Sequence, residues 1–474
     1  MQWRVLAAIW LSAFLVSLDY TAVNVALPTL ASEFNAGTSA VSWVALSYML
    51  VVVALTLPAG AAINRLGYRT VLTWSLSLFA LASLASGLTS DLWSLVAMRA
   101  VQGIGASIMF AIGPAMIKTM FASETQSRAF AIFSTGPTAG LCAGPAIGGQ
   151  LTERFGWQAI FMFSLAAAVL AIALLRIAPQ AVPHQGTPAP HAVARTAHPL
   201  IVGLAFAALL TLLLGLNQGH EWGWQSPRIV LLFVASVAIL LVLVLIERRA
   251  LAPLIGRELL AAAGFVTAGA ILFPLLVVFG GTVFLVPFYF EWLLKADTGL
   301  VGRVLMVQPI ATIAVSSLAA FCFTATGRRT LCRAGIVLFT LGVAALALAD
   351  RDASLAIPIA ALSLMGAGMG LYYPTMIELS MADVPDHLAA SASGLQATGR
   401  SLAQLLGVVL FETAFAGLFP MALHGELAAA ASGMDLVNMQ SAFRAVFWFG
   451  TAIAAVALLP SFLVGNAKSV GEKT

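Results

Sequence analysis

Apolar runs of about twenty residues recur along the whole chain, and no other feature constrains its fold as strongly. A helix needs about 20 mainly apolar residues to cross the hydrocarbon of a bilayer. The chain contains fourteen such runs, near 4–28, 40–62, 70–89, 94–117, 128–150, 158–178, 199–216, 229–246, 264–290, 302–324, 333–349, 355–377, 391–416 and 443–464. The sequence therefore predicts an all-α polytopic membrane protein with fourteen spanning helices.

The composition excludes a soluble fold for a chain of 474 residues. Apolar residues make up 61% of it and charged residues only 9%, whereas about 25% of a soluble domain is charged. The net charge of +4 comes from basic residues spread over the predicted loops, so it does not indicate nucleic-acid binding. Cys142, Cys322 and Cys332 lie in or beside apolar runs without metal-ligand spacing. We expect neither a metal nor any other cofactor.

The basic residues indicate how the chain is oriented. With the N-terminus in the cytoplasm, fifteen of the 23 Lys and Arg residues fall in predicted inner segments and six in outer segments. This is the bias that the positive-inside rule requires, and one missed or extra helix would scramble it. The first run is longer than the apolar core of a signal peptide and carries Asp19 and Asn24, so we expect it to remain as a spanning helix. The prediction is a multi-pass protein of the cell's inner (cytoplasmic) membrane with both termini cytoplasmic.

A short internal repeat indicates how the spans are grouped. Gly67 and Arg69, after the second run, align with Gly327 and Arg329, after the tenth. Two six-helix halves around two inserted helices would place these loops at equivalent positions. A stretch rich in Pro, Ala and His predicts a flexible cytoplasmic linker before the insertion. We expect an N-terminal six-helix bundle at 1–178, the linker at 179–198, two inserted helices with their following loop at 199–258, and a C-terminal six-helix bundle at 259–474.

Four motifs carry a resemblance to a known family. In chain order they read LDYTAVNVALP at 18–28, GAAINRLGYRTVL at 60–72, RAVQGIGA at 99–106 and GLCAGPAIGG at 140–149. They resemble the first-helix, inner-loop, fourth-helix and antiporter motifs of the major facilitator superfamily, specifically its fourteen-helix drug:proton antiporter branch. The resemblance covers most of the first 160 residues and becomes thinner afterwards. It implies a major facilitator fold of two six-helix bundles plus two inserted helices, driven by the proton gradient.

The resemblance implies that two of these motifs act in gating. The residues concerned are Gly60, Asn64, Arg65, Gly67, Arg69, Gly140, Gly144, Pro145, Gly148 and Gly149. Asn64 stands where the family usually has Asp, so the inner gate is either held less tightly or uses another partner for Arg65 and Arg69. In the antiporter motif, glycines at small-xxx-small spacing with a proline suit a helix that seals or pivots. Ordinary close packing is the alternative.

Ionisable residues inside the spans are functional candidates because they are expensive to bury in a bilayer. Asp19 and Arg99 lie at depths that differ by about 6 Å at 1.5 Å per residue, which an arginine side chain can cover. We predict that Arg99 tunes Asp19 and that protonation of Asp19 weakens the pair; a fixed ion pair is the alternative. Glu412, near the outer end of its helix, is a second proton site, a cation-recognition site or an interfacial residue.

A polar stripe marks the thirteenth run, at Ser393, Gln396, Arg400, Gln404 and Gly407. Such a stripe must face a cavity or other helices, since lipid cannot satisfy it. Polar and aromatic residues elsewhere could line the same cavity, although plain packing explains any one of them equally well. The predicted substrate-cavity residues are Asn24, Tyr48, Gln102, Gln308, Tyr372, Tyr373, Gln396, Arg400 and Gln404.

These features predict a proton-coupled antiporter that exports amphiphilic small molecules or drugs by alternating access. The first alternative is a proton-coupled or facilitative transporter of a specific metabolite or lipid. A membrane-embedded transferase is a remote alternative, because all six histidines lie in predicted loops without a catalytic grouping; we expect no enzyme activity. The expected partners are a small-molecule substrate, protons and the lipid bilayer, without nucleic acid, and we expect a monomer.

Overall fold

The structure is a computed structural model of the 474-residue chain. It describes all residues except 1, 122, 178–198, 250–256, 323–326, 350–354, 383, 386–387, 420–432 and 465–474. The predicted linker at 179–198 therefore lies outside the described residues.

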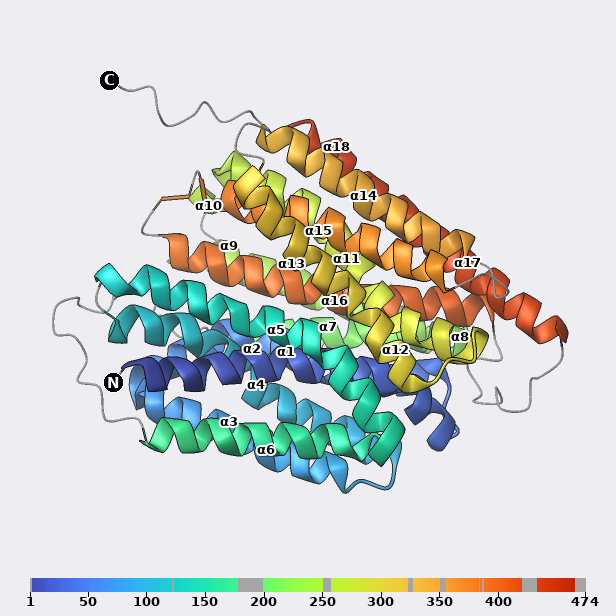
Figure 1. The fold of residues 1–474 in the computed structure, drawn as a ribbon, viewed down its shortest axis with the longest axis horizontal. Helices are drawn as coiled ribbons and strands as arrows, with labels where there is room; N and C mark the ends of the chain where they lie inside the picture. Colours follow the sequence, from blue (N-terminus) through green and yellow to red (C-terminus); the bar gives the residue numbers. More distant parts are fainter. Residues whose placement is uncertain are drawn as a thin grey trace. The chain divides into compact units, whose positions relative to one another are not determined.

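Helices account for nearly all of the described chain (Figure 1). The first half contains α1 (Gln2–Glu33), α2 (Thr38–Leu66), α3 (Tyr68–Gly87), α4 (Leu92–Met120), α5 (Ser123–Phe155), α6 (Gln158–Ile177), α7 (Pro199–Asn217), α8 (Gly219–Trp222) and α9 (Pro227–Arg249). The second half contains α10 (Arg257–Ala261), α11 (Ala263–Phe288), the π-helical turn η1 (Tyr289–Leu293), α12 (Thr298–Leu305), α13 (Val307–Cys322), α14 (Arg328–Leu348), α15 (Ala356–Ala382), α16 (Ala389–Leu418), α17 (Gly433–Val456) and α18 (Leu458–Ser461).

The helices fall where the apolar runs predicted them. Within the described residues, 13 helical spans are long and apolar enough to cross a membrane. The remaining expected run, 128–150, lies on α5, a helix of 33 residues. The run at 302–324 is divided between α12 and α13, and the last run continues from α17 into α18. The predicted all-α polytopic fold is confirmed.

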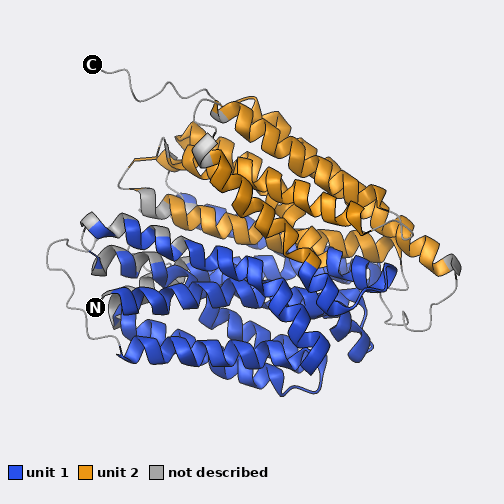
Figure 2. Cartoon of the chain, in the orientation of Figure 1, with its two compact units in different colours: residues 1–251, 286–303, 420–429 blue, residues 252–285, 304–419, 430–474 orange. Residues whose placement is uncertain are grey.

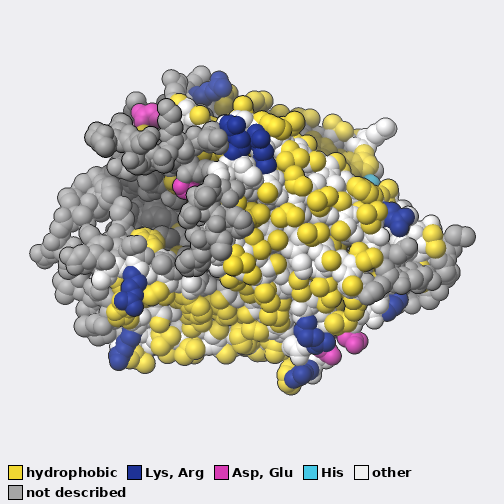
Figure 3. Space-filling view, turned by 45° about the horizontal axis from the view of Figure 1, so that its top comes forward, with side chains coloured by type: hydrophobic (Ala, Val, Ile, Leu, Met, Phe, Trp, Pro, Cys, Tyr) yellow, Lys and Arg dark blue, Asp and Glu magenta, His cyan; other side chains and the backbone are white. Residues whose placement is uncertain are grey.

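The outer surface matches a lipid environment. Figure 3 shows a face covered mainly by hydrophobic side chains, with few charged side chains among them. Helix α9 is an extreme case, because only 11% of its most apolar window is buried inside the protein. In a bilayer such side chains meet hydrocarbon, while the helical backbone satisfies its own hydrogen bonds.

The chain divides into two compact units, which are coloured separately in Figure 2. Unit 1 comprises residues 1–251, 286–303 and 420–429, and unit 2 comprises 252–285, 304–419 and 430–474. The end of α11 and the beginning of α12 thus belong to unit 1, although they follow the inserted helices in the chain. The predicted boundaries at 178, 198 and 258 stay a prediction.

The same helix pairings occur in both units. In unit 1, α4 packs on α2 and α3, and α3 also packs on α6. In unit 2, α15 packs on α13 and α14, and α14 also packs on α17. These are the second, third, fourth and sixth spans of each predicted half, so the packing repeats as the two-half arrangement expects. The inserted helices α7 and α9 pack on each other, and α7 also packs on α2.

Equivalent arginines join the third and sixth spans of each half. Arg69 Nη2 donates to the carbonyl oxygens of Leu175 and Arg176, at 2.5 and 3.0 Å, at the end of α6. Arg329 Nε donates to the carbonyl oxygen of Val464 at 2.7 Å, just after α18. A cation at a helix C-terminus satisfies carbonyls that have no intrahelical partner. The short sequence repeat therefore corresponds to a repeated structural contact.

Candidate functional site

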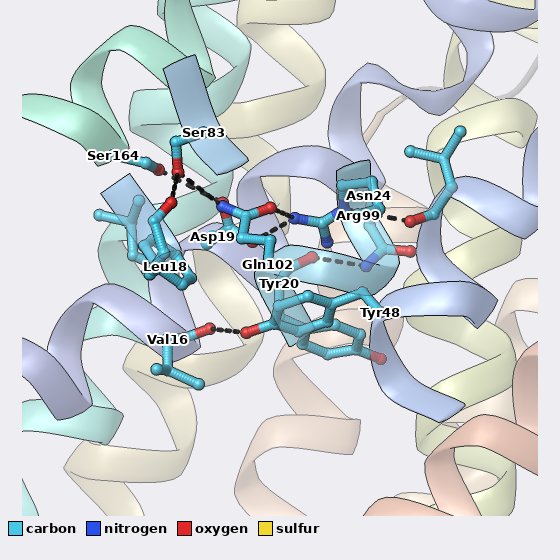
Figure 4. A network of polar contacts seen from close by, with 12 residues as sticks. Val16, Leu18, Asp19, Tyr20, Asn24, Tyr48, Ser83, Arg99, Gln102 and Ser164 are labelled. Atoms are coloured by element: carbon cyan, nitrogen blue, oxygen red, sulfur yellow. Dashed lines mark hydrogen bonds and ion pairs between the residues drawn. The ribbon is translucent and has the colours of Figure 1, made fainter. Parts of the chain in front are cut away.

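A buried ion pair lies inside unit 1, between α1 and α4 (Figure 4). The side chain of Asp19 is 0% exposed and that of Arg99 is 1% exposed. Arg99 Nη1 lies 2.5 Å from Asp19 Oδ2. The structure thus brings together the two residues whose depths in the membrane suggested a pair.

Further donors complete the surroundings of the Asp19 carboxylate. Gln102 Nε2 donates to Asp19 Oδ1 at 3.1 Å, and Ser164 Oγ, from α6, donates to the same oxygen at 3.3 Å. Gln102 is one turn beyond Arg99 on α4, so both side chains reach the same face of α1. Gln102 Nε2 also donates to Ser83 Oγ of α3 at 2.9 Å. The carboxylate is held by contacts that involve four helices.

Arg99 has its own set of partners besides Asp19. Its Nε donates to the carbonyl oxygen of Val44 in α2 at 3.1 Å, and its Nη1 donates to Gln102 Oε1 at 2.5 Å. The ring of Tyr48 lies 4.2 Å from Arg99 Cζ, measured to the ring centroid. A guanidinium over an aromatic face gains cation–π stabilisation, especially away from water. These contacts add to the ion pair in fixing the position of the guanidinium.

Two further polar residues of α1, Tyr20 and Asn24, lie close to Asp19 in the chain. Asn24 Nδ2 donates to the carbonyl oxygen of Tyr20 at 2.6 Å. Asn24 Oδ1 and the Tyr20 hydroxyl are buried and have no hydrogen-bond partner among the described residues. Buried polar atoms without partners are rare in folded proteins and call for an explanation. They are available to a bound molecule or to a rearrangement of α1.

The antiporter motif packs α5 directly onto the helix that carries Asp19. A side chain at Gly140 would meet the backbone of Phe14 and Leu18, and one at Gly144 would meet Leu18 and Thr21. A Cβ atom at Gly148 would lie 2.6 Å from the Cα of Ala22. These three glycines therefore allow close helix contact along the Asp19 segment of α1. Gly149 and Pro145 instead meet the backbone of α12 around Gly302.

Comparison with known proteins identifies the family. The family model described as Major Facilitator Superfamily matches residues 9–216 and 200–408. The chain belongs to the major facilitator superfamily. The predicted resemblance is confirmed, and relatives with drug-resistance and export names place the chain in the drug-transporter branch.

Several curated relatives of this superfamily member span most of its length. The riboflavin transporter RibZ of Clostridioides difficile (strain 630) is 28% identical over 422 residues, which cover 88% of each chain. The tetracenomycin C resistance and export protein of Streptomyces glaucescens is 26% identical over 435 residues, 88% of this chain and 77% of that protein. The multidrug resistance protein Stp of Mycobacterium tuberculosis (strain ATCC 25618 / H37Rv) is 26% identical over 430 residues, 90% of this chain and 78% of that protein.

Solved structures support the same fold. A bacterial homologue of the human lysosomal transporter Spinster, in an inward-facing and occupied conformation, matches with a TM-score of 0.66 and 15% identity over 97% of each chain. The xylose transporter XylE from E. coli, in a partially occluded inward-open conformation, matches with a TM-score of 0.63 and 13% identity over 100% of this chain and 99% of that chain. Both likenesses concern the fold alone. The protein is a multi-pass membrane transporter of this superfamily.

The other predicted gating residues of this transporter are only partly described. Gly60, Asn64 and Arg65 lie in α2, but the structure does not describe their side chains. Gly67 caps the N-terminus of α3 with a φ of 82°, in the left-handed region that favours glycine. Arg69 uses the α6 carbonyls described above, so one of the two motif arginines has a partner other than residue 64.

Most of the remaining predicted cavity residues lie in unit 2. Arg400 Nη1 donates to the Tyr373 hydroxyl at 3.1 Å, and Gln396 Nε2 donates to Ser380 Oγ at 2.8 Å. Two residues of the α16 stripe therefore form hydrogen bonds to α15, as expected if the stripe faces other helices. A Cβ atom at Gly280 would lie 2.6 Å from the Gln404 Cα, so this part of α16 is closely packed on α11.

Three further predicted residues are buried in unit 2. Glu412 is 0% exposed on α16. Gln308 Nε2 and the Tyr372 hydroxyl are buried without a hydrogen-bond partner in the described part of the chain. Their roles in proton or substrate binding stay predictions. No group of three or more His, Cys, Asp and Glu residues that could hold a metal occurs among the described residues.

Sequence reasoning missed Ser83 and Ser164, the two hydroxyls that complete the ion-pair surroundings. Both lie in apolar spans, on α3 and α6 respectively. Serines are frequent in these spans, so nothing in the local pattern distinguishes these two. Only the packing of α4 and α6 on α1, and of α3 on α4, selects them.

Proposed function

We propose that this transporter is a proton-coupled antiporter that exports amphiphilic small molecules by alternating access. The observation that carries the proposal is the fully buried Asp19, paired with the equally buried Arg99. Ionisable residues in the membrane interior are associated with proton relays and substrate pathways. Asp19 would bind the proton and Arg99 would link its charge state to the packing of α1 and α4.

The physical basis of coupling is the mutual dependence of two buried charges. Breaking a buried pair by neutralising one partner costs about 3–5 kcal/mol because the other charge loses its compensation. Protonation of Asp19 would therefore disfavour the packing seen here and favour a conformation in which Arg99 finds another partner or water. The glycines of α5 would let α1 shift along a smooth surface.

The substrate class is inferred from the relatives and the polar residues of both units. Several relatives are named as drug resistance or export proteins. Sites that accept varied amphiphiles combine apolar walls with few polar groups. Within unit 1, Asn24 and Tyr20 would supply such groups; within unit 2, taken by itself, Gln308, Tyr372 and Arg400 would do so.

Reconstituted protein in liposomes with an acidic lumen tests the proposal. Ethidium serves as an amphiphilic cationic probe, and a trapped dye reports the internal pH. An antiporter accumulates ethidium in the acidic lumen while protons leave, whichever way the protein is inserted. Ethidium-driven proton movement should be absent from protein-free liposomes. Transport of a drug panel without any accompanying proton movement would refute antiport.

A second candidate is a transporter of a specific metabolite, which the similarity to a riboflavin transporter favours. The same liposomes, preloaded with riboflavin, distinguish the two functions. A metabolite transporter would exchange radiolabelled riboflavin for unlabelled riboflavin without a pH gradient and would leave ethidium distribution unchanged. The proposed location is the cytoplasmic membrane with both termini inside, which fluorescent and alkaline phosphatase fusions to the C-terminus would test.

A further inference from the structure

A second, partly buried carboxyl group lies in unit 1, just after the last residue of α11. Glu291 belongs to the π-helical turn η1 that follows α11. Its Oε1 lies 3.2 Å from Thr29 Oγ1 of α1 and within hydrogen-bonding distance of Thr298 Oγ1 of α12. Its Oε2 is buried and has no partner among the described residues. One carboxyl group thus joins the ends of three helices.

The backbone around Glu291 is built to bring these three ends together. The π turn is closed by a hydrogen bond from the Leu294 N–H to the Tyr289 carbonyl at 3.2 Å. The chain then reverses through Lys295, whose φ is 53°, so that Thr298 returns to the carboxyl seven residues later. Single π turns inside or at the end of α-helices occur frequently at functional sites.

The charges near Glu291 differ from those near Asp19. The elements packed around it carry Glu33 on α1, Glu153 and the exposed Arg154 on α5, Lys295 and Asp297 in the turn, and Arg303 on α12. Glu33 accepts a hydrogen bond from Trp157 Nε1 at 2.8 Å, and Glu153 lies against Gly299. Lys295 and Arg303 are exposed, and in the described structure no basic side chain pairs with Glu291. Its surroundings therefore lack a compensating cation.

The hydrogen bonds available to Glu291 in this packing favour its neutral, protonated form. An ionised carboxylate would bury a charged oxygen, Oε2, without a donor or a counter-charge, which is strongly unfavourable. If Glu291 is neutral, its protonated Oε1 can donate to the Thr298 hydroxyl. The Thr298 hydroxyl can then donate to the Thr29 hydroxyl, 3.4 Å away, and the Thr29 hydroxyl can donate to Oε1. Only a neutral carbonyl oxygen is then left without a partner, and that is a much smaller loss.

We propose that Glu291 is a second proton-binding site, occupied while the ends of α1, α11 and α12 are packed together and empty when they separate. One proton passes from water to the carboxylate as these ends close and returns to water as they open. In the expected topology this end faces the outside. The link to transport rests on the proposed function: an external proton on Glu291 would favour closure of the outer end after substrate release.

Distance measurements between spin labels at this end test the proposal. Ser32 and Arg303 are both exposed, so labels at Ser32→Cys and Arg303→Cys, in a background without the native cysteines, report the separation of α1 and α12. In lipid nanodiscs without substrate, the short distance should dominate at low pH and give way to a longer one as the pH rises. Glu291→Gln, which stays neutral, should keep the short distance throughout. Opening on acidification, or an unchanged transition in Glu291→Gln, would overturn the proposal.

Matched variants separate this site from general effects and from the transport proposal. Glu33→Gln removes a carboxylate at the same end of α1 and should leave the transition in place. Thr298→Val should move the midpoint to lower pH, because the neutral acid loses its acceptor, and Thr298→Ser should restore it. The distance measurement uses neither substrate nor a gradient, so it stands even if liposomes show no proton-coupled transport. A missing transition would exclude Glu291 as a proton-binding site and would leave the proposal for Asp19 untouched.

Discussion

At the level of single residues, Asp19 and Arg99 depend on each other for their burial. Neither charge reaches water in this conformation, and each has neutral hydrogen-bond partners in addition to the other. Glu291 has neutral partners only. A carboxyl group with a fixed cation and one without therefore respond differently to the same proton concentration.

Replacing Asp19 with asparagine should abolish proton-coupled efflux while the protein still inserts. Asn keeps the shape but loses the charge, and Arg99 is left without compensation at a cost of about 3–5 kcal/mol. The measurement is ethidium efflux in everted vesicles, with membrane abundance determined by immunoblot. Ser164→Ala is the matched control, since it removes one neutral donor to the same carboxylate and should retain most activity. Efflux by Asp19→Asn at the rate of the unmodified protein would exclude Asp19 from the mechanism.

At the level of elements, the antiporter motif is a packing surface on α1. Its glycines at 140, 144 and 148 meet successive turns of the helix that carries Asp19. The sequence motif therefore contacts the Asp19 segment of α1 directly.

Gly148→Ala should impair both stability and transport. The new Cβ would lie 2.6 Å from Ala22 Cα, and backbone cannot move aside as a flexible side chain can. Overpacking of this kind typically costs about 1–3 kcal/mol. Gly203→Ala on α7 is the control, because nothing lies within 4 Å of its Cβ position. It should be neutral or slightly stabilising, since Ala favours helix over Gly. Equal melting temperatures in detergent for both variants would contradict the packing interpretation.

The N-terminus of α4, the helix that carries Arg99, provides a prediction about pH. Asp91 caps this helix, and hydrogen bonds from Ser94 lower the pKa of its carboxyl. A lowered pKa in the folded state means that the cap stabilises above the unfolded pKa and that its contribution is lost as the pH falls through the folded value. Asp91→Ala should therefore lower the melting temperature at pH 7, and the difference should shrink in acid. Asp91→Asn, which keeps a capping oxygen, should show a smaller loss. A pH-independent difference would argue against the charged cap.

At the level of the whole molecule, the repeat extends from sequence to helix pairing and to a specific contact. The third span of each half begins with an arginine that binds the end of the sixth span. The two inserted helices contact the rest of unit 1 through α2, where Asn217 of α7 forms hydrogen bonds with Ser42 and Trp43. The insertion thus adds to the surface of unit 1 without interrupting its internal pairings.

Arg69→Ala and Arg329→Ala should destabilise the protein by similar amounts. Each removes charge-assisted hydrogen bonds to helix-terminal carbonyls, worth about 1.5–3 kcal/mol when well formed and less when partly exposed. Thermal unfolding of the purified protein measures the effect, and Arg4→Ala is a control because Arg4 is exposed at the beginning of α1. A clear loss in only one of the two variants would show that the halves are not energetically equivalent.

The sequence by itself determined the helical membrane fold, the approximate positions of the spans, the family and the most conspicuous buried charges. Hydrocarbon demands a continuous apolar run for each span, so these properties are local and can be counted. Asp19 and Arg99 were recognisable because a charge inside such a run is rare. Glu291 escaped notice because it lies at the end of a run, where a carboxyl group is unremarkable.

Only the tertiary structure decided which groups meet. Ser164 donates to Asp19, Ser83 accepts from Gln102, and Thr29 and Thr298 join Glu291, all from helices that are distant in the chain. Partner choice depends on the rotation and depth of each helix against its neighbours, and apolar patterning leaves both undetermined where most faces are apolar. The physical reason is that the bilayer requires an apolar run of each helix separately, whereas a site forms only after several helices have packed together.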